Sequence, residues 1–367
     1  MRAAFVERFG DPYVFREVPK PPSPKHHDLL IKVLAASYCH TDAVFASGGL
    51  SQGLPRVGCH EFSGEIIAVG PDVRTELGLA VELHVGIPGR AYHPCTTCFE
   101  YTHPGGDQMG YSAYCPKAKN LGLTQDGGFQ EYCLVDSRQV APIPSTLTAT
   151  QAAPLMCAGL TIWAALHHER LRSVRRIAIL GAGGGLGHLG VQFAVHLGFD
   201  VVAIDLSDSS LDLLHNIQEK VSHARGQLHV VDARKADADM IRSLDHDVHS
   251  EAPPEEIGVD AVIFLPESQH AFDLGMEILK NHGTMVVLSF PQKKLEVSAH
   301  DLVFRDICIV GSLVGRNHQV REMLQFAAMN DVLPQVRTFP FDALNELVEE
   351  YHKGYGGKLV VDMLNRK

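Results

Sequence analysis

The run Arg176-Ile177-Ala178-Ile179-Leu180 and the glycine-rich stretch after it, Gly181-Ala182-Gly183-Gly184-Gly185-Leu186-Gly187, decide the fold of this chain. From Ile177 onward the run is apolar without alternation, which is typical of a parallel strand buried on both faces. Residues 189–197 follow with apolar side chains at helical spacing and stop before Gly198. Residues 201–205 then form a second apolar run, so the pattern predicts a strand, a tight turn, a helix and another strand.

The same alternation continues beyond this unit. Apolar runs predict strands at 228–231, 259–265 and 284–290, and helical periodicity predicts helices near 208–219 and 269–280. Regular β-α alternation is the signature of a doubly wound parallel sheet, which we expect over residues 159–294. The acidic, proline-bearing stretch 245–256 is expected to form a surface loop.

The glycine-rich turn has the features of a dinucleotide site. A strand that ends in glycines and leads into a helix presents backbone N–H groups to a pyrophosphate, here those of Gly181, Gly184, Gly185, Leu186 and Gly187. The next strand ends at Asp205, where a carboxylate accepts hydrogen bonds from a ribose 2′-hydroxyl and repels a 2′-phosphate. We therefore expect NAD rather than NADP. The alternative is a glycine-rich helix start without a ligand.

The remaining sequence, residues 1–158 and 295–367, predicts a second, β-rich domain. Short apolar alternations at 28–33 and 64–70 indicate strands, and long helical periodicity is missing before residue 155. The tail adds helices near 319–329 and 341–352 and a strand at 358–361. The catalytic domain is therefore expected to be discontinuous in sequence.

Composition narrows the class of protein. The net charge of −11 over 367 residues argues against nucleic acid or an anionic membrane as the partner. The start, Met1 to Arg8, lacks an apolar signal core, and no apolar run is long enough to span a bilayer. Eight cysteines, two of them spaced as Cys95-x-x-Cys98, indicate metal ligation in a cytoplasmic protein rather than a disulfide framework.

Zinc-binding side chains occur in three segments: Cys39-His40-Thr41-Asp42, Val57-Gly58-Cys59-His60-Glu61 and Leu155-Met156-Cys157-Ala158-Gly159. Thiolate, imidazole and carboxylate are the ligands of catalytic zinc, which keeps one position open for water or substrate. A zinc site and a dinucleotide site in one chain suggest hydride transfer on an alcohol or a carbonyl.

These segments occur in order with Asp126-Gly127-Gly128-Phe129-Gln130-Glu131-Tyr132, the glycine turn and Ile309-Val310-Gly311-Ser312-Leu313-Val314-Gly315. Together they resemble the zinc-containing medium-chain alcohol dehydrogenases, especially the branch of tetrameric microbial enzymes, over nearly the whole chain. The resemblance implies an α/β architecture with a GroES-like β-rich catalytic domain and a Rossmann NAD-binding domain. It also implies a small-molecule alcohol or carbonyl substrate and a homo-oligomer, either dimer or tetramer.

The resemblance also implies roles for individual residues. Cys39, His60 and Cys157 match the catalytic zinc ligands, and Glu61 matches a carboxylate that binds the zinc in some states and withdraws in others. Asp42 matches the acid that orients the zinc histidine. The other matches are Thr41, which hydrogen-bonds the substrate oxygen and starts proton transfer, His40 near the pyrophosphate, and Thr161 in the nicotinamide pocket.

The resemblance also raises the question of a second, structural zinc. The family often carries a loop of four cysteines, and here Cys95 and Cys98 fit the first two positions. Tyr101 occupies the third position, and Cys115 comes late, after an apparent insertion. His103 is the first candidate for the third ligand, since a Cys₃His site is chemically acceptable, and His93 and Asp107 are poorer candidates. The alternative is a loop without metal.

Four departures from the family pattern bear on function. The usual relay histidine is replaced by Val44, and the glycine before the zinc histidine is Cys59. Two tryptophans that narrow the pocket of enzymes for small alcohols are missing, and the only one in the chain, Trp163, falls in the first helix of the nucleotide domain. We therefore expect a substrate larger than ethanol. Finally, the usual Gly-Asp turn is rewritten as Glu82-Leu83.

The sequence thus predicts an NAD- and zinc-dependent alcohol dehydrogenase or carbonyl reductase. A zinc-free enoyl or quinone reductase of the same fold is one alternative, which the intact ligand set opposes. A nucleotide-binding protein without catalytic activity is another, supported by the missing relay histidine and the altered loop, and opposed by the retention of Thr41 and the zinc ligands.

Overall fold

The structure is a computed structural model that describes residues 1–50, 53–91, 113–115, 117–244, 253, 256–354 and 356–365. Contacts divide the chain into two compact units. The first contains Met1–Leu160 and Val314–Gly354 together with the chain from Lys358 onward, and the second consists mainly of Thr161–Leu313. Each unit has its own hydrophobic core.

The first unit is built mainly on antiparallel strand pairs, as expected for a GroES-like domain, although β17 and β18 pair in parallel. Its largest sheet has the order β10-β6-β5-β3-β18-β17, with β9 also paired to β3. Smaller sheets have the orders β2-β1-β4 and β7-β8. The long strand β3 is central because it pairs with β5, β9 and β18. The strands are β1 (Arg2–Val6), β2 (Val14–Glu17), β3 (Asp28–Tyr38), β4 (Arg56–Val57), β5 (Glu61–Val69), β6 (His84–Ile87), β7 (Arg90–Ala91), β8 (Lys119–Asn120), β9 (Tyr132–Asp136), β10 (Ala141–Pro142), β17 (Val336–Pro340) and β18 (Lys358–Asp362).

Short helices complete this unit. They are α1 (His40–Ala46), α3 (Ala149–Pro154), α10 (Asn317–Met329) and α11 (Leu344–His352), with 3₁₀ turns η1 (Thr75–Leu77), η2 (Ser137–Gln139) and η6 (Phe341–Ala343). Helix α3 packs against β3 and β5, so it buries one face of the main sheet. It leads into a π-helical turn, η3 (Leu155–Gly159), which carries Cys157.

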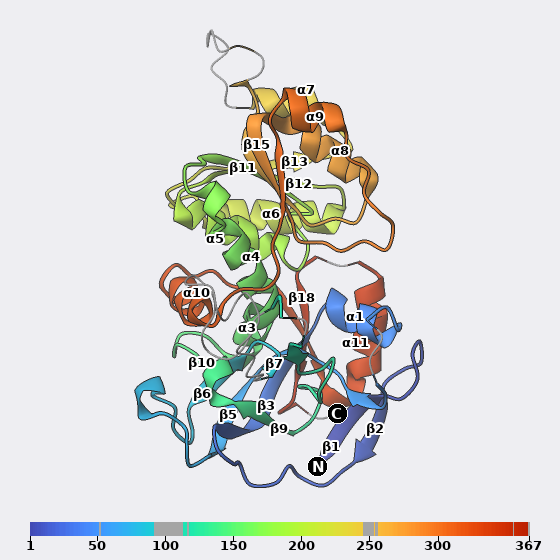
Figure 1. Cartoon of the computed structure of the whole chain (residues 1–367), viewed down its shortest axis with the longest axis vertical. Coiled ribbons are helices and arrows are strands. Elements are labelled where there is room, and N and C mark those ends of the chain that lie inside the picture. Colours follow the sequence, from blue (N-terminus) through green and yellow to red (C-terminus); the bar gives the residue numbers. More distant parts are fainter. Residues whose placement is uncertain are drawn as a thin grey trace. The chain divides into compact units, whose positions relative to one another are not determined.

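The second unit is the predicted parallel sheet, with the order β13-β12-β11-β14-β15-β16 and parallel pairing throughout. Helices α5 and α6 pack against β11, β12 and β13, whereas α8 packs against β11, β14 and β15 (Figure 1). The elements are β11 (Arg176–Leu180), β12 (Asp200–Asp205), β13 (Leu228–Asp232), β14 (Val259–Phe264), β15 (Leu279–Val287), β16 (Cys308–Gly311), α4 (Leu160–Leu166), η4 (Glu169–Leu171), α5 (Gly187–Leu197), α6 (Asp208–Lys220), α7 (Ala238–Ser243), α8 (Gln269–Ile278) and α9 (Ala299–Phe304).

Local chemistry explains the boundaries of α5. Gly181 has φ 75 in the turn after β11, which a residue with a side chain rarely adopts. A Cβ at Gly187 would lie 2.3 Å from the Gly181 carbonyl oxygen, so only glycine lets the helix start so close to the strand. Gly198 ends the helix in a left-handed conformation, φ 99.

The sequence predicts that the nucleotide-binding domain ends at residue 294. In the structure this boundary comes later, because the second unit continues to Leu313. The physical reason is β16, which pairs in parallel with β15 from Thr284↔Cys308 to Val287↔Gly311 and so extends the parallel sheet by one strand.

One helical stretch, Ala149–Leu166, has the length and apolar composition of a membrane span. However, 72% of it is buried inside the protein, which is the pattern of a core helix. Trp163 lies in this stretch with an exposed fraction of 4% and packs edge-on against Phe193, with ring centroids 5.3 Å apart.

Candidate catalytic metal site

The predicted zinc ligands Cys39, His60 and Cys157 come together in the first unit. Their ligand atoms all lie within 4.8 Å of one another, and Cys39 and His60 are buried. Cys39 Sγ is 3.4 Å from His60 Nε2. Tetrahedral zinc with a sulfur and a nitrogen ligand separates those two atoms by roughly 3.5 Å. The donor types and their spacing therefore fit a zinc ion.

The start of α1 positions Cys39. This residue is the N-cap of the helix, and its Sγ accepts a hydrogen bond from the Thr41 N–H at 3.3 Å. In return, the Asp42 carboxylate accepts the Cys39 N–H at 3.1 Å, so the two residues form a reciprocal capping box. The thiol is thereby held at a fixed point at the helix N-terminus, where partial positive charge favours a thiolate.

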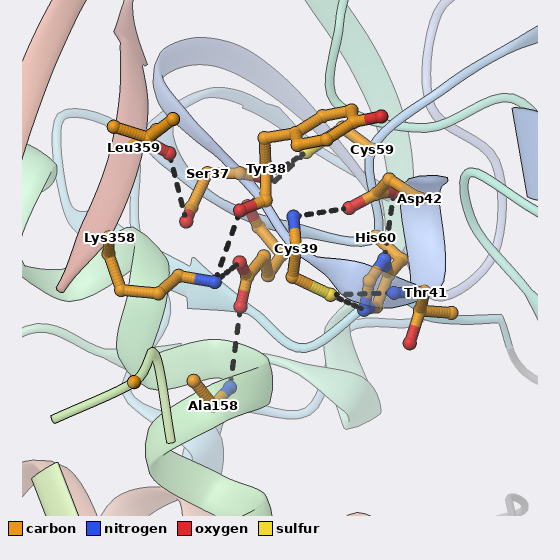
Figure 2. Close-up of polar contacts among 12 residues, drawn as sticks. Ser37, Tyr38, Cys39, Thr41, Asp42, Cys59, His60, Ala158, Lys358 and Leu359 are labelled. Carbon is orange, nitrogen blue, oxygen red and sulfur yellow. Dashed lines mark hydrogen bonds and ion pairs between the residues drawn. The ribbon is translucent and has the colours of Figure 1, made fainter. Parts of the chain in front are cut away.

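Asp42 also orients His60. Its other oxygen, Oδ1, is 2.9 Å from His60 Nδ1, and the Asp42 side chain is only 1% exposed. A carboxylate at Nδ1 keeps the proton on that nitrogen and leaves Nε2 free to bind a metal. Figure 2 shows the resulting order, with His60 between Asp42 on one side and the Cys39 sulfur on the other.

The charges in the cluster suit a cation. Burial opposes ionisation of the Cys39 thiol, but the hydrogen bond from Cys157 and the charge of His60 hold the pKa of Cys39 well below its ordinary value. Its hydrogen bond to Cys39, together with burial, raises the pKa of Cys157. Burial disfavours the imidazolium, yet Asp42 and the Cys39 thiolate raise the pKa of His60. A divalent cation would take the place of the protons that hold these donors together.

Glu61 is close to this cluster, but its carboxylate is bound elsewhere. Oε1 forms an ion pair with Lys358, and Oε2 accepts the Ala158 N–H at 3.3 Å. The Lys358 ammonium also donates to the Tyr38 carbonyl at 3.3 Å. Burial raises the pKa of Glu61 to about 7, although the cation of Lys358 works against that rise. The structure thus has Glu61 in a position withdrawn from the three metal donors.

Lys358 is the residue that the sequence did not reveal. It opens β18, and its partner Glu61 is 297 positions away in the chain. The pairing arises because β18 and β5 flank β3 on opposite sides. In the sequence, this contact is indicated by no more than a lysine placed directly before the apolar run Leu359-Val360-Val361.

Two positions that depart from the family pattern have a left-handed backbone. Cys59 and Glu82 replace family glycines, and both have left-handed backbones, with φ 76 and φ 70. A side chain in this region costs about 1–2 kcal/mol relative to the right-handed backbone. The Cys59 thiol is buried, and its sulfur is 3.4 Å from the Ser37 carbonyl oxygen and 3.3 Å from that of Glu61.

The other predicted residues of this unit are less closely tied to the cluster. Thr41 is half-buried beside Cys39, whereas His40 is exposed, with Nδ1 3.1 Å from the Tyr351 hydroxyl. Val44 lies in α1, and its aliphatic side chain has no group that could donate or accept a proton. Cys95, Cys98 and His103 lie outside the described residues, and Cys115 is buried.

The predicted nucleotide-binding residues gather in the second unit. Gly181, Gly184, Gly185 and Leu186 form the turn between β11 and α5, and Gly187 begins the helix. Asp205, at the end of β12, accepts the Gly183 N–H at 2.8 Å and the Leu206 N–H at 2.8 Å. Its carboxylate is thus fixed at the carboxyl end of the sheet, beside the change of strand order at β11, where such sheets bind ligands. Thr161 is buried in α4.

The fold and the metal-ligand cluster together are those of a zinc-binding dehydrogenase. Family models agree, since residues 25–145 match the alcohol dehydrogenase GroES-like domain and residues 185–329 match the zinc-binding dehydrogenase family. An alcohol dehydrogenase of Geobacillus stearothermophilus is 32% identical over 365 residues, which is 98% of this chain and 99% of the relative. The chain belongs to the zinc-binding medium-chain alcohol dehydrogenase family.

Solved structures give the same result. The alcohol dehydrogenase of Aeropyrum pernix has a TM-score of 0.82 and 25% identity, covering 99% of this chain and 100% of that one. The acetophenone reductase of Geotrichum candidum, solved in complex with NAD, has a TM-score of 0.78 and 25% identity, covering 98% and 97%. The protein is therefore an alcohol dehydrogenase that acts on small-molecule alcohols or carbonyl compounds.

Proposed function

We propose that this enzyme is NAD-dependent and uses one catalytic zinc, held by Cys39, His60 and Cys157, to interconvert an alcohol with an aldehyde or ketone. The observation that carries the proposal is the convergence of the three donor atoms to within 4.8 Å at a buried site. A structural zinc bound by Cys95, Cys98, His103 and Cys115 remains a separate proposal.

Each residue of the site has a proposed task. When bound, zinc supplies Lewis acidity at the substrate oxygen, and the nicotinamide carries the hydride. Asp42 accepts from His60 Nδ1 and so aims Nε2 at the metal. Thr41 moves the proton to or from the substrate oxygen, and a water or another polar group continues its path because Val44 has no proton to give. Glu61 stays withdrawn from the zinc while its carboxylate is paired with Lys358.

The proposed cofactor preference rests on Asp205. Its carboxylate is held by two backbone N–H groups, so its negative charge stays at the end of β12. That charge would repel a 2′-phosphate, whereas a 2′-hydroxyl would donate a hydrogen bond to the carboxylate. His40 is proposed to contact the pyrophosphate and Thr161 to line the nicotinamide pocket.

The proposed substrate is larger than ethanol. The only tryptophan is buried against Phe193 and is not available to narrow a pocket. The similarity to an acetophenone reductase supports an aromatic or comparably large carbonyl compound. Each buried methylene contributes roughly 0.8 kcal/mol, which is about fourfold in kcat/KM if the transition state retains it. The test is a kcat/KM series over aldehydes of rising size, and a steady fall from acetaldehyde upward would overturn this part.

We also propose a homo-oligomer in the cytosol. Val303 and Phe304 in α9 are each 73% exposed, and β16, the next strand, is an edge of the parallel sheet. Apolar side chains beside an open strand edge favour association with a second copy. Cys39, Cys59, Cys133, Cys157 and Cys308 form no disulfide, which suits a reducing compartment.

The decisive experiment combines metal analysis with NADH oxidation by a panel of aldehydes. The proposal predicts that the unmodified enzyme contains zinc and oxidises NADH with an aldehyde. It also predicts that His60→Ala loses the catalytic zinc and the turnover. Turnover of enones or quinones without zinc would favour the reductase alternative, and zinc and NADH binding without turnover would favour a non-catalytic protein.

A further inference from the structure

We propose that Gly89, Gly122 and Gly127 are positioning residues for the metal ligand His60, because their backbones clamp the two peptides that flank His60 in the chain. We call this packing the glycine clamp. The inference rests on the proposed zinc role of His60. It concerns what fixes the backbone of this ligand, whose imidazole makes the hydrogen bond with Asp42.

The steric evidence is direct. A Cβ on Gly127 would lie 1.9 Å from the Cys59 carbonyl oxygen, and one on Gly122 would lie 2.4 Å from that oxygen and 2.9 Å from the His60 nitrogen. A Cβ on Gly89 would lie 2.0 Å from the His60 carbonyl oxygen and 2.8 Å from its Cβ. Real Cβ atoms essentially never approach within 3.0 Å. Gly122 and Gly127 therefore require glycine because of the Cys59–His60 peptide, and Gly89 requires it because of the His60–Glu61 peptide.

Hydrogen bonds fasten the clamp to the segment that precedes His60. The Gly127 N–H donates to Val57 at 3.0 Å and the Gly128 N–H donates to Cys59 at 2.9 Å. The Phe129 N–H donates to Gly58 at 3.1 Å, so residues 127–129 follow the segment before His60. The Leu121 N–H, just before Gly122, donates to the Gly89 carbonyl at 2.8 Å, so this bond connects two of the segments that carry the clamp.

The clamp matters because metal geometry has a narrow tolerance. Metal–ligand distances vary by about 0.2 Å in a working site. A methyl group at Gly127 would force the Cys59 carbonyl oxygen to move by about 1.5 Å, from 1.9 Å to the 3.4 Å at which ordinary contacts begin. His60 follows this peptide directly, so its ring would lose the 3.4 Å approach to Cys39 or the 2.9 Å contact with Asp42. Loss of such orientation typically weakens metal binding by about 10–100-fold.

The test compares Gly127→Ala with Gly70→Ala in the full-length zinc protein. Gly70 is a matched control because a Cβ there would also meet backbone, 2.4 Å from the His26 oxygen and 2.9 Å from that of Asp28, in the same unit but outside the clamp. We expect Gly127→Ala to bind zinc at least about tenfold more weakly in competition with a chelator. Its cobalt-substituted form is expected to show a shifted visible spectrum, while Gly70→Ala keeps the normal affinity and spectrum. Unchanged affinity in folded Gly127→Ala would overturn the inference.

Cys59→Gly decides the matter if Gly127→Ala does not fold. This change relieves the left-handed backbone at φ 76 and removes the thiol while leaving the clamp intact. We expect zinc affinity within about threefold of normal. A tenfold loss would mean that the Cys59 thiol, and not the glycine clamp, positions His60. Absence of zinc from the unmodified protein would instead contradict the proposed function and would be visible before any variant is compared.

Discussion

Lys358 and Glu61 form an ion pair inside the protein, with exposed side-chain fractions of 4% and 0%. The pair lies next to the metal donors, because Glu61 follows His60 directly in the chain. Lys358 also donates to Tyr38, which precedes Cys39. One lysine thus connects β18 to the two segments that carry the first two ligands.

Removing Lys358 should leave a buried carboxylate without its cation. We expect Lys358→Met to destabilise the metal-free protein by about 3–5 kcal/mol. The double variant Lys358→Met/Glu61→Gln should recover most of that loss, because the uncompensated charge is gone. Denaturant unfolding of the metal-free proteins measures both.

Lys353→Met is the control, since Lys353 pairs with Glu350 at the surface, where Lys353 is 56% exposed. Such a pair is worth less than about 1 kcal/mol. If the double variant were as unstable as Lys358→Met alone, the charge of Glu61 would not be the cause.

Asp42→Asn tests the orientation of His60. The amide is a weaker acceptor than the carboxylate at Nδ1, so we expect zinc affinity to fall by about 10–100-fold with little loss of fold. Competition with a chelator gives the affinity. Asp72→Asn is the matched control, because Asp72 makes the same 2.9 Å contact with Nδ1 of His26 on the exposed surface. Equal affinities for the two variants would contradict the role of Asp42.

Asp205→Asn tests cofactor choice. The amide oxygen can still accept the Gly183 N–H, but the negative charge that opposes a 2′-phosphate is lost. We expect the ratio of kcat/KM for NADH to that for NADPH to fall by roughly tenfold, which corresponds to about 1.4 kcal/mol. Steady-state kinetics with both cofactors measures it. An unmodified enzyme that uses both equally well would refute the NAD assignment.

Asp260 makes the stability of the second unit depend on pH. Burial would raise its pKa, but the N–H groups of Arg176 and Arg175 and the cation of Lys280 lower it on balance. A folded-state pKa below the unfolded value of about 3.9 gives stability that is present above that pH and lost as the pH falls through the folded value.

We therefore expect Asp260→Asn to lose about 1–2 kcal/mol at neutral pH and the difference to shrink below about pH 4. Urea unfolding over a pH series measures this. Asp212→Asn on the exposed face of α6 serves as the control. A difference that grows on acidification would have the wrong sign.

The sequence predicted the parallel sheet well, since β11 and β12 are apolar runs punctuated by glycines and α5 ends at Gly198. It missed α1 because seven residues carry little periodicity, and it missed β16 because four residues carry even less. Three of the residues it proposed as metal ligands, Cys39, His60 and Cys157, have donor atoms within 4.8 Å of one another. Lys358 and the glycine clamp depend on contacts between distant segments, which no local pattern encodes.

The central claim is that Cys39, His60 and Cys157 hold a zinc on which turnover depends. The most direct measurement is the zinc-to-protein ratio of the unmodified enzyme and of His60→Ala, taken with the rate of NADH oxidation by an aromatic aldehyde. We predict that His60→Ala has one zinc fewer per chain and nearly no activity, while it still binds NADH. A His60→Ala enzyme with the full zinc content, or with a near-normal rate, would contradict the account.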